Sequence, residues 1–304
     1  MIKNSEKPVS DHPLSNADFI FFMSSSGHCS LDCSYCIVNP IVKHQPSLTL
    51  QDIEYLLDSV GGKSAIAFSG KGDFFAGYRK GDKLLSRLLD REVDVGLDIN
   101  GVMIHEFPDL SDEKLNKIRH INLTLHYVQI KNKNALKVWE QNAKLLIRKQ
   151  RCHTFLMGTI LSPHDVELWE EALRFYDHHV FQETGMRITL IRDVLNWESR
   201  FEERLESLRN KFDYLVAETR HVDFSQMFKM TDEVICPAGK AFFRVWNDGR
   251  IEGCPYIGEL SDCGNAKART FAPRETFFRC SQPKYCDCNL IGRLGKMQLA
   301  AADS

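Results

Sequence analysis

Short apolar runs alternate with amphipathic segments along the first two thirds of the chain. The apolar runs have the length and composition of buried strands, and they predict strands at residues 19–23, 64–69, 93–100, 121–126, 154–161 and 187–191. The segments between them carry apolar positions at helical spacing, and they predict helices at residues 50–60, 82–91, 112–118, 135–149 and 165–177. This order is typical of a parallel sheet with right-handed crossovers.

Two of these helices have recognisable start signals. Thr49 directly precedes the helix predicted at 50–60 and is a favourable N-cap residue. Pro163 lies at the start of the helix predicted at 165–177, where its missing N–H has no helical partner to lose. A parallel sheet of this kind is either a doubly wound layer or an open (β/α) barrel. In both architectures ligands gather at the carboxyl ends of the strands.

The pattern changes in the last third of the chain. Residues 200–215 are charged and helical in pattern, and they are expected to link to a separate C-terminal unit that begins near residue 230. That unit consists of short segments rich in glycine and cysteine. Residues 242–249 predict a strand that runs into an Asp-Gly hairpin turn, with Cys236 before the hairpin and Cys254 after it.

Charge and composition exclude several classes of protein. The 304 residues include 39 Lys and Arg against 41 Asp and Glu, a net charge of -2 that lacks the basic surface of a dedicated nucleic-acid binder. The basic stretch at 267–296 is interpreted as a solvated face. The polar N-terminus has no signal-peptide core and no apolar run is long enough to cross a membrane. A cytoplasmic protein is therefore expected, without nucleic-acid or membrane partners.

Ten cysteines are many for a cytoplasmic chain, where thiols stay reduced unless they bind metal or react. The first group, Cys29, Cys33 and Cys36, has the spacing C-x3-C-x2-C and follows the first predicted strand. Three thiolates on one tight loop can ligate three corners of a four-iron cluster and leave the fourth iron open. Zinc, with His28 or His44 as a fourth ligand, is the competing interpretation.

The cysteine loop, with Tyr35 directly before Cys36, resembles the signature of the radical S-adenosylmethionine (radical SAM) superfamily. The resemblance implies that Cys29, Cys33 and Cys36 hold a [4Fe-4S] cluster whose open iron chelates S-adenosylmethionine. One electron, supplied by a donor such as flavodoxin or ferredoxin, would then cleave this cofactor to a 5′-deoxyadenosyl radical. The implied fold is a partial (β/α)6 TIM-like barrel of class α/β.

The resemblance also assigns cofactor-binding roles at the ends of later strands, beside that of Tyr35. Gly70, Gly72 and Asp73 resemble the Gly-x-Gly-Glu motif that binds the methionine amino group, although this chain has Asp where Glu is common. Asn100 resembles the Asn that closes the third strand in the family, and Thr124 resembles a Ser or Thr that faces the cofactor.

Other side chains near the strand ends have weaker assignments. Contacts with the cofactor or substrate are considered for His126, Tyr127, Thr159, Arg187 and Arg192. A structural histidine is the alternative for His126, and a surface ion pair is the alternative for Arg187 and Arg192. Cys152 and His153 precede the fifth strand, at the end away from the ligand edge, and are expected to be structural.

The second cysteine group, with its hairpin, resembles the SPASM or twitch auxiliary-cluster domain of radical SAM enzymes. The resemblance implies one auxiliary [4Fe-4S] cluster that carries electrons. Its ligands are expected among Cys236, Cys254, Cys280, Cys286 and Cys288. Cys263 is either a further ligand or a spare thiol, and a zinc ribbon is the alternative for the whole group. The predicted domains are a tail at 1–17, a barrel at 18–229 and a Cys-rich α+β auxiliary domain at 230–304.

These features predict a radical SAM enzyme, an oxidoreductase, that abstracts hydrogen from its substrate. About eighteen residues precede the first strand, too few for a peptide-recognition domain, which favours a small-molecule substrate. A peptide-modifying maturase is the enzymatic alternative. A zinc or iron-sulfur module without catalysis is the remaining one.

Overall fold

A computed structural model of the chain describes residue 14 and residues 16–24, 28–36, 48–69, 72–192, 198–220, 234–254, 262–280 and 298–299. The strands in these ranges are β1 (Phe19–Ser24), β2 (Ser64–Ser69), β3 (Val93–Ile99), β4 (Ile118–Leu125), β5 (Thr154–Leu161), β6 (Ile188–Arg192), β7 (Val216–Arg220), β8 (Val234–Cys236), β9 (Phe242–Val245), β10 (Arg250–Glu252), β11 (Asp262–Asn265), β12 (Phe278–Cys280) and β13 (Gln298–Leu299). The α-helices are α1 (Leu50–Asp58), α2 (Phe74–Gly77), α3 (Leu84–Leu89), α4 (Asp112–Leu115), α5 (Tyr127–Asn132), α6 (Leu136–Lys149), α7 (Trp169–Tyr176), α8 (Gln182–Thr184) and α9 (Glu202–Lys211). None of the described helices combines the length and the hydropathy that crossing a bilayer demands.

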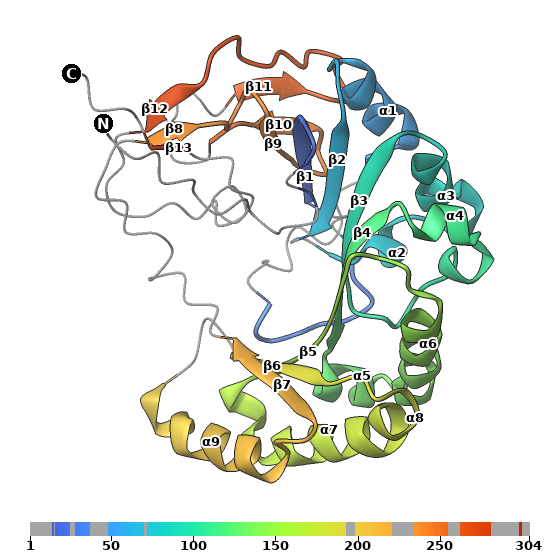
Figure 1. Ribbon diagram of the computed structural model, residues 1–304, viewed down its shortest axis with the longest axis vertical. Helices are drawn as coiled ribbons and strands as arrows, with labels where there is room; N and C mark the ends of the chain where they lie inside the picture. The colour runs from blue at the N-terminus through green and yellow to red at the C-terminus, as the bar shows by residue number, and fades with distance from the viewer. Residues whose placement is uncertain are drawn as a thin grey trace, which may run out of the picture.

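Within this part of the chain, ten strands form one curved sheet in the order β11-β10-β9-β1-β2-β3-β4-β5-β6-β7. Strands β9 and β1 to β7 run parallel to one another, whereas β10 is antiparallel to both β9 and β11. Figure 1 shows the sheet as an open arc with the helices α1 to α9 on its outer side. The predicted fold class, an α/β partial barrel, is confirmed.

The six predicted strands correspond to β1 to β6, and the predictions at 64–69 and 154–161 match β2 and β5 at both ends. The five helices predicted between them correspond to α1, α3, α4, α6 and α7. The helix predicted at 165–177 begins earlier, as a 3-10 segment over Pro163–Leu168, and the α-helix starts only at Trp169. Element types are thus set by the hydrophobic period, whereas the ends depend on local turns.

The helical pattern at residues 200–215 is confirmed, and their role as a link to a separate C-terminal unit stays a prediction. The segment forms α9, which leads into a seventh barrel strand, β7, parallel to β6. Strand β7 lies at the edge of the sheet, and of its described side chains Val216 is buried whereas Ala217 and Glu218 are exposed. A strand with so few buried positions lacks the apolar run that marks the six others.

The predicted hairpin near the C-terminus is confirmed. Strands β9 and β10 pair antiparallel, and the Gly249 N–H donates to the Trp246 carbonyl oxygen at 2.9 Å across the turn, where Gly249 has a φ of +94°. Strand β9 also pairs in parallel with β1, so that Phe243 lies beside Phe21 in register. The ten-stranded sheet therefore contains strands from both sides of residue 230. The domain boundary near that residue stays a prediction.

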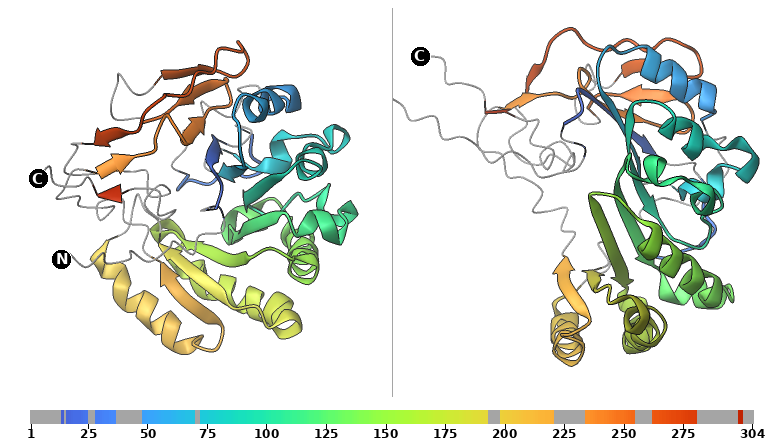
Figure 2. Two further views of the ribbon diagram at one scale, coloured as in Figure 1. Left: turned by 45° about the horizontal axis from the view of Figure 1, so that its top comes forward. Right: turned by 45° about the vertical axis from the view of Figure 1, so that its right-hand side comes forward.

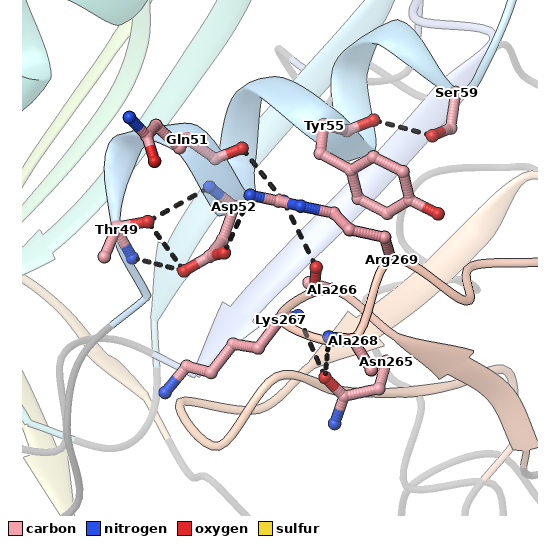
Figure 3. A network of polar contacts seen from close by, with 10 residues as sticks. All are labelled: Thr49, Gln51, Asp52, Tyr55, Ser59, Asn265, Ala266, Lys267, Ala268 and Arg269. Atoms are coloured by element: carbon pink, nitrogen blue, oxygen red, sulfur yellow. Dashed lines mark hydrogen bonds and ion pairs between the residues drawn. The ribbon is translucent and has the colours of Figure 1, made fainter.

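Helix α1 joins the barrel to the C-terminal segment that follows β11 (Figure 3). Thr49 is its N-cap, as predicted, and shares a capping box with Asp52, in which each side chain accepts a backbone N–H of the other. The Arg269 guanidinium pairs with Asp52 at 3.3 Å and donates to the Gln51 carbonyl oxygen at 3.0 Å. The Arg269 guanidinium also lies 4.8 Å from the centre of the Tyr55 ring. These contacts fix the C-terminal segment against the outer face of the barrel.

The two faces of the sheet differ in polarity. Side chains that alternate along each strand point to opposite faces. One set packs into the hydrophobic core between sheet and helices, and it includes Phe21, Met23, Ile66, Phe68, Val95, Leu97, Leu123 and Leu125. The opposite, concave face carries Ser69, Asp98, His120, Asn122 and Thr124, all partly exposed. Both views in Figure 2 keep the helices on the outer side of the arc, away from the concave face.

Candidate functional site

The cysteine loop, residues 28–36, follows β1 and is bonded to the carboxyl ends of the next three strands. The Asp73 N–H, after β2, donates to the His28 carbonyl oxygen at 2.7 Å. The Asn100 side chain, after β3, contacts Cys29, and His126, after β4, contacts Cys33. The loop therefore lies at the ligand edge of the sheet that the sequence predicts.

Cys29 is half-buried and receives two hydrogen bonds at its sulfur. The Leu31 backbone N–H donates to Cys29 Sγ at 3.4 Å and Asn100 Nδ2 donates at 3.6 Å. Burial is the largest cause that raises the pKa of the Cys29 thiol, the charges of Asp73 and Cys36 raise it further, and the two hydrogen bonds lower it. Donors directed at sulfur are the environment of a thiolate ligand.

His126 connects two further residues of the cysteine loop. Its Nδ1 lies 2.9 Å from the Tyr35 hydroxyl and 3.6 Å from Cys33 Sγ, and the Tyr35 and His126 rings stack with an interplanar angle of 13°. Burial lowers the pKa of His126 to about 4, so its imidazole is neutral at neutral pH. Position in sequence suggested only that His126 stands at the strand end. Its contact with the loop, 91 residues before it, depends on the fold.

The residues of the cysteine loop fit a cluster held by three thiolates. Cys29 and Cys33 are half-buried, Cys36 is exposed, and the Cys36 N–H donates to the Cys33 carbonyl oxygen at 3.1 Å in a tight turn. Among the residues that the structure describes, no three cysteine, histidine or carboxylate groups lie close enough to hold one metal ion. The fit therefore rests on the shared loop and on the hydrogen-bond donors at sulfur.

Asp73 has both carboxylate oxygens occupied by backbone groups. It is 1% exposed; Oδ2 accepts the Asn100 N–H at 2.7 Å and Oδ1 accepts the Ala76 N–H at 3.2 Å, which makes Asp73 the N-cap of α2. Burial raises the pKa of Asp73 to about 6. The predicted contact of Asp73 with the methionine amino group stays a prediction. In the structure its carboxylate holds the backbone of Asn100 and the start of α2 in place. Gly72 is at a φ of +91°, and Gly70 lies outside the described residues.

Asn100 forms hydrogen bonds through both its side chain and its backbone. It is 5% exposed, and its Oδ1 accepts the Val102 N–H at 2.9 Å. Its Nδ2 donates to Ser30 Oγ at 3.2 Å as well as to Cys29. Its carbonyl oxygen accepts the Trp139 indole N–H at 2.9 Å. The structure places Asn100 against the cysteine loop, and its predicted contact with the cofactor stays a prediction.

The other predicted side chains divide between the concave face and structural roles. Thr124 lies on the concave face, and its contact with the cofactor stays a prediction. Thr159 donates to the Leu125 carbonyl oxygen at 2.9 Å. Arg187 donates to a backbone carbonyl at 2.7 Å and Arg192 pairs with Glu202 at 2.7 Å. These contacts favour the structural interpretation of Thr159 and both arginines.

The C-terminal cysteines have different environments. Cys236 and Cys254 are buried, at 4% and 7% exposure. Cys263 is 1% exposed and packs in the hydrophobic core, where burial raises the pKa of its thiol. This environment favours the interpretation of Cys263 as a spare thiol.

Of the remaining ligands predicted for the auxiliary cluster, the structure describes only the backbone of Cys280. The backbone of Cys280 is in β12, which pairs antiparallel with β8, the strand that ends at Cys236. In that register Phe278 is opposite Cys236, so Cys280 is two positions away along the strand. Cys286 and Cys288 lie outside the described residues, as does His44.

Two comparisons relate this chain to known proteins. The crystal structure of Streptococcus suis SuiB bound to precursor peptide SuiA is similar, with a TM-score of 0.47 and 14% identity over 82% of this chain and 62% of that one. This chain thus spans less than two thirds of that protein, and no curated protein matches it significantly. The sequence model of the radical SAM superfamily matches residues 23–139, which contain the cysteine loop and the strand ends bonded to it. Residues 23–139 of this chain are therefore similar to the radical SAM superfamily.

Proposed function

We propose that the protein is an enzyme that reductively cleaves S-adenosylmethionine and uses the 5′-deoxyadenosyl radical to abstract hydrogen from a small polar molecule. The cysteine loop, bonded to the ends of β2, β3 and β4, is the observation that carries the proposal. Cys29, Cys33 and Cys36 would hold a [4Fe-4S] cluster, which supplies the electron for the cleavage. A small redox protein such as flavodoxin or ferredoxin would be the donor.

The chain's own residues prepare the site for this chemistry. The Leu31 N–H and Asn100 Nδ2 stabilise the thiolate of Cys29. Neutral His126 lies against Cys33 and Tyr35 without adding positive charge beside the thiolates. The core between the sheet and the helices keeps the strand ends rigid, which holds a substrate's reacting carbon in place.

The concave face of the sheet supports a polar substrate. Asp98 accepts hydrogen bonds from Ser69 Oγ and, at 2.7 Å, from Asn122 Nδ2, so three neighbouring strands share one polar row. The Asp98 side chain is 38% exposed and keeps room for a further donor. It precedes Asn100 by two residues, about 7 Å along a strand. A hydroxyl or ammonium group bound to Asp98 would thus place substrate next to the cysteine loop.

The Asp98→Asn variant should consume its substrate about tenfold to a hundredfold more slowly, because a hydrogen bond to a charged group is lost. Its formation of 5′-deoxyadenosine without substrate should stay within about twofold of the parent protein. Substrate consumption is measured by untargeted comparison of metabolite extracts before and after incubation with reduced enzyme.

Asp94→Asn is the matched control, since Asp94 is on the same strand and pairs with Lys63 at 2.9 Å and Arg119 at 2.7 Å, further from the loop. Equal consumption by the Asp98→Asn and Asp94→Asn variants would refute the role of Asp98. Consumption of a precursor peptide in place of a metabolite would favour a peptide-modifying enzyme.

We further propose that the C-terminal region holds an auxiliary [4Fe-4S] cluster that takes an electron from the substrate radical. Buried Cys236 and Cys254 flank the hairpin, and the β8–β12 pairing brings the backbone of Cys280 close to Cys236. Cys286 and Cys288 are the other proposed ligands. Four protein ligands would leave no open iron, which suits an electron carrier.

Anaerobic reconstitution tests both proposals. The chain is expected to bind about eight irons, four in each cluster, and to form 5′-deoxyadenosine when reduced in the presence of S-adenosylmethionine. About four irons with full cofactor cleavage would remove the auxiliary cluster and keep the main proposal. Zinc without iron would refute both and leave a zinc-binding module.

A further inference from the structure

We propose that Asn100 is a positioning residue that sets the reduction potential of the cluster on the cysteine loop. Its side-chain amide is the donor that reaches across from β3 to the sulfur of Cys29 at 3.6 Å. The proposal rests on the proposed function, because it requires a cluster bound through Cys29. In this proposal Asn100 acts on the cluster through its hydrogen bond to Cys29, and not through a contact with S-adenosylmethionine.

The amide of Asn100 can present only its N–H groups to the cysteine loop. Its Oδ1 accepts the Val102 N–H at 2.9 Å, which fixes which end of the amide faces the loop. The two Nδ2 hydrogens are then directed at Cys29 Sγ and Ser30 Oγ. Since Asn100 is 5% exposed, water has little access to compete for these hydrogens.

The backbone of Asn100 is held on both sides of its Cα atom. Its N–H donates to Asp73 Oδ2 at 2.7 Å, and its carbonyl oxygen accepts the Trp139 indole N–H at 2.9 Å. Asp73 also donates its own N–H to the His28 carbonyl oxygen, directly before Cys29. Asp73 thus links Asn100, the donor to Cys29, with His28, the residue before Cys29. Together these hydrogen bonds form a closed ring.

A hydrogen bond to a cluster thiolate withdraws electron density from sulfur and stabilises the reduced cluster. Loss of one such bond is therefore expected to lower the reduction potential. A tenfold decrease in the equilibrium constant for one-electron reduction corresponds to about 59 mV. The effect is separate from cluster binding, because the three cysteines remain.

The test is an EPR-monitored redox titration of the reconstituted full-length protein and its Asn100→Leu variant. Leucine has a similar size but no donor, and we expect its midpoint potential to be about 59 mV more negative, a tenfold change. The Asn100→Asp variant keeps the acceptor for the Val102 N–H and is expected to shift the potential in the same direction. Iron content is measured for each protein.

Asn142→Leu is the matched control. Asn142 Nδ2 donates to the carbonyl oxygens of Gly101 and Val102, so it supports the same turn without touching a cysteine. Its variant should keep the parent potential. An unchanged potential in the iron-loaded Asn100→Leu variant, or an equal shift in Asn142→Leu, would overturn the role of Asn100. A parent protein without an EPR-active cluster would instead overturn the proposed function.

Discussion

The Cys33→Ala variant is expected to lose about four irons per chain and to form no 5′-deoxyadenosine. Cys33 lies at the centre of the cysteine loop, its carbonyl oxygen accepts the Cys36 N–H, and its sulfur lies 3.6 Å from His126 Nδ1. Alanine keeps the backbone turn and removes only the sulfur. Iron and sulfide are assayed after anaerobic reconstitution, and 5′-deoxyadenosine is quantified by chromatography after reduction with S-adenosylmethionine.

Cys152→Ser provides the control for loss of a thiol as such. Cys152 is half-buried before β5, its sulfur lies 3.5 Å from Gln150 Oε1, and burial raises its pKa to about 11. Cys152 precedes β5, at the end of the sheet opposite the cysteine loop, so this variant should keep full iron content and full activity. Full cofactor cleavage by Cys33→Ala, or loss of iron in Cys152→Ser, would contradict the assignment of the loop.

The periodicity of apolar residues was enough to predict the barrel strands that are buried on the helix side. Strands β2 and β5 were placed at both ends because apolar runs and flanking polar residues mark them. Strand β7 was missed because it is a short edge strand, and the pairing of β9 with β1 was missed because it joins residues more than 200 positions apart. Local patterns carry no information on such contacts.

Sequence spacing likewise located the cysteine loop but not the hydrogen bonds around it. The resemblance to radical SAM motifs assigns Asn100 and Asp73 to the cofactor, and that contact stays a prediction. In the structure the two residues contact each other: Asp73, after β2, accepts the backbone N–H of Asn100, after β3, at 2.7 Å. His126 follows β4, and it contacts Cys33 and Tyr35 because the cysteine loop extends from β1 past the ends of β2 and β3.

The Trp139→Ala variant is expected to lower the free energy of unfolding by about 3–5 kcal/mol. Trp139 is fully buried on α6, among the largest side chains of the core, and its indole N–H donates to the Asn100 carbonyl oxygen at 2.9 Å. The ring of Trp139 also lies beside Gly101, where an added Cβ would be 3.0 Å from Trp139 Nε1. Urea unfolding followed by far-UV circular dichroism measures the change.

The Trp139→Phe and Val138→Ala variants separate the causes of this loss. Phenylalanine keeps most of the ring but not the donor, so it should cost less than alanine, about 1–3 kcal/mol for the unsatisfied carbonyl and the smaller volume. Val138 directly precedes Trp139 on α6 and is 47% exposed, so its truncation should change the free energy of unfolding by less than about 0.5 kcal/mol. Since the same indole holds the backbone of Asn100, Trp139→Phe should also shift the cluster potential in the direction of Asn100→Leu, and by less. Wild-type stability in Trp139→Ala would show that α6 does not support the third strand end.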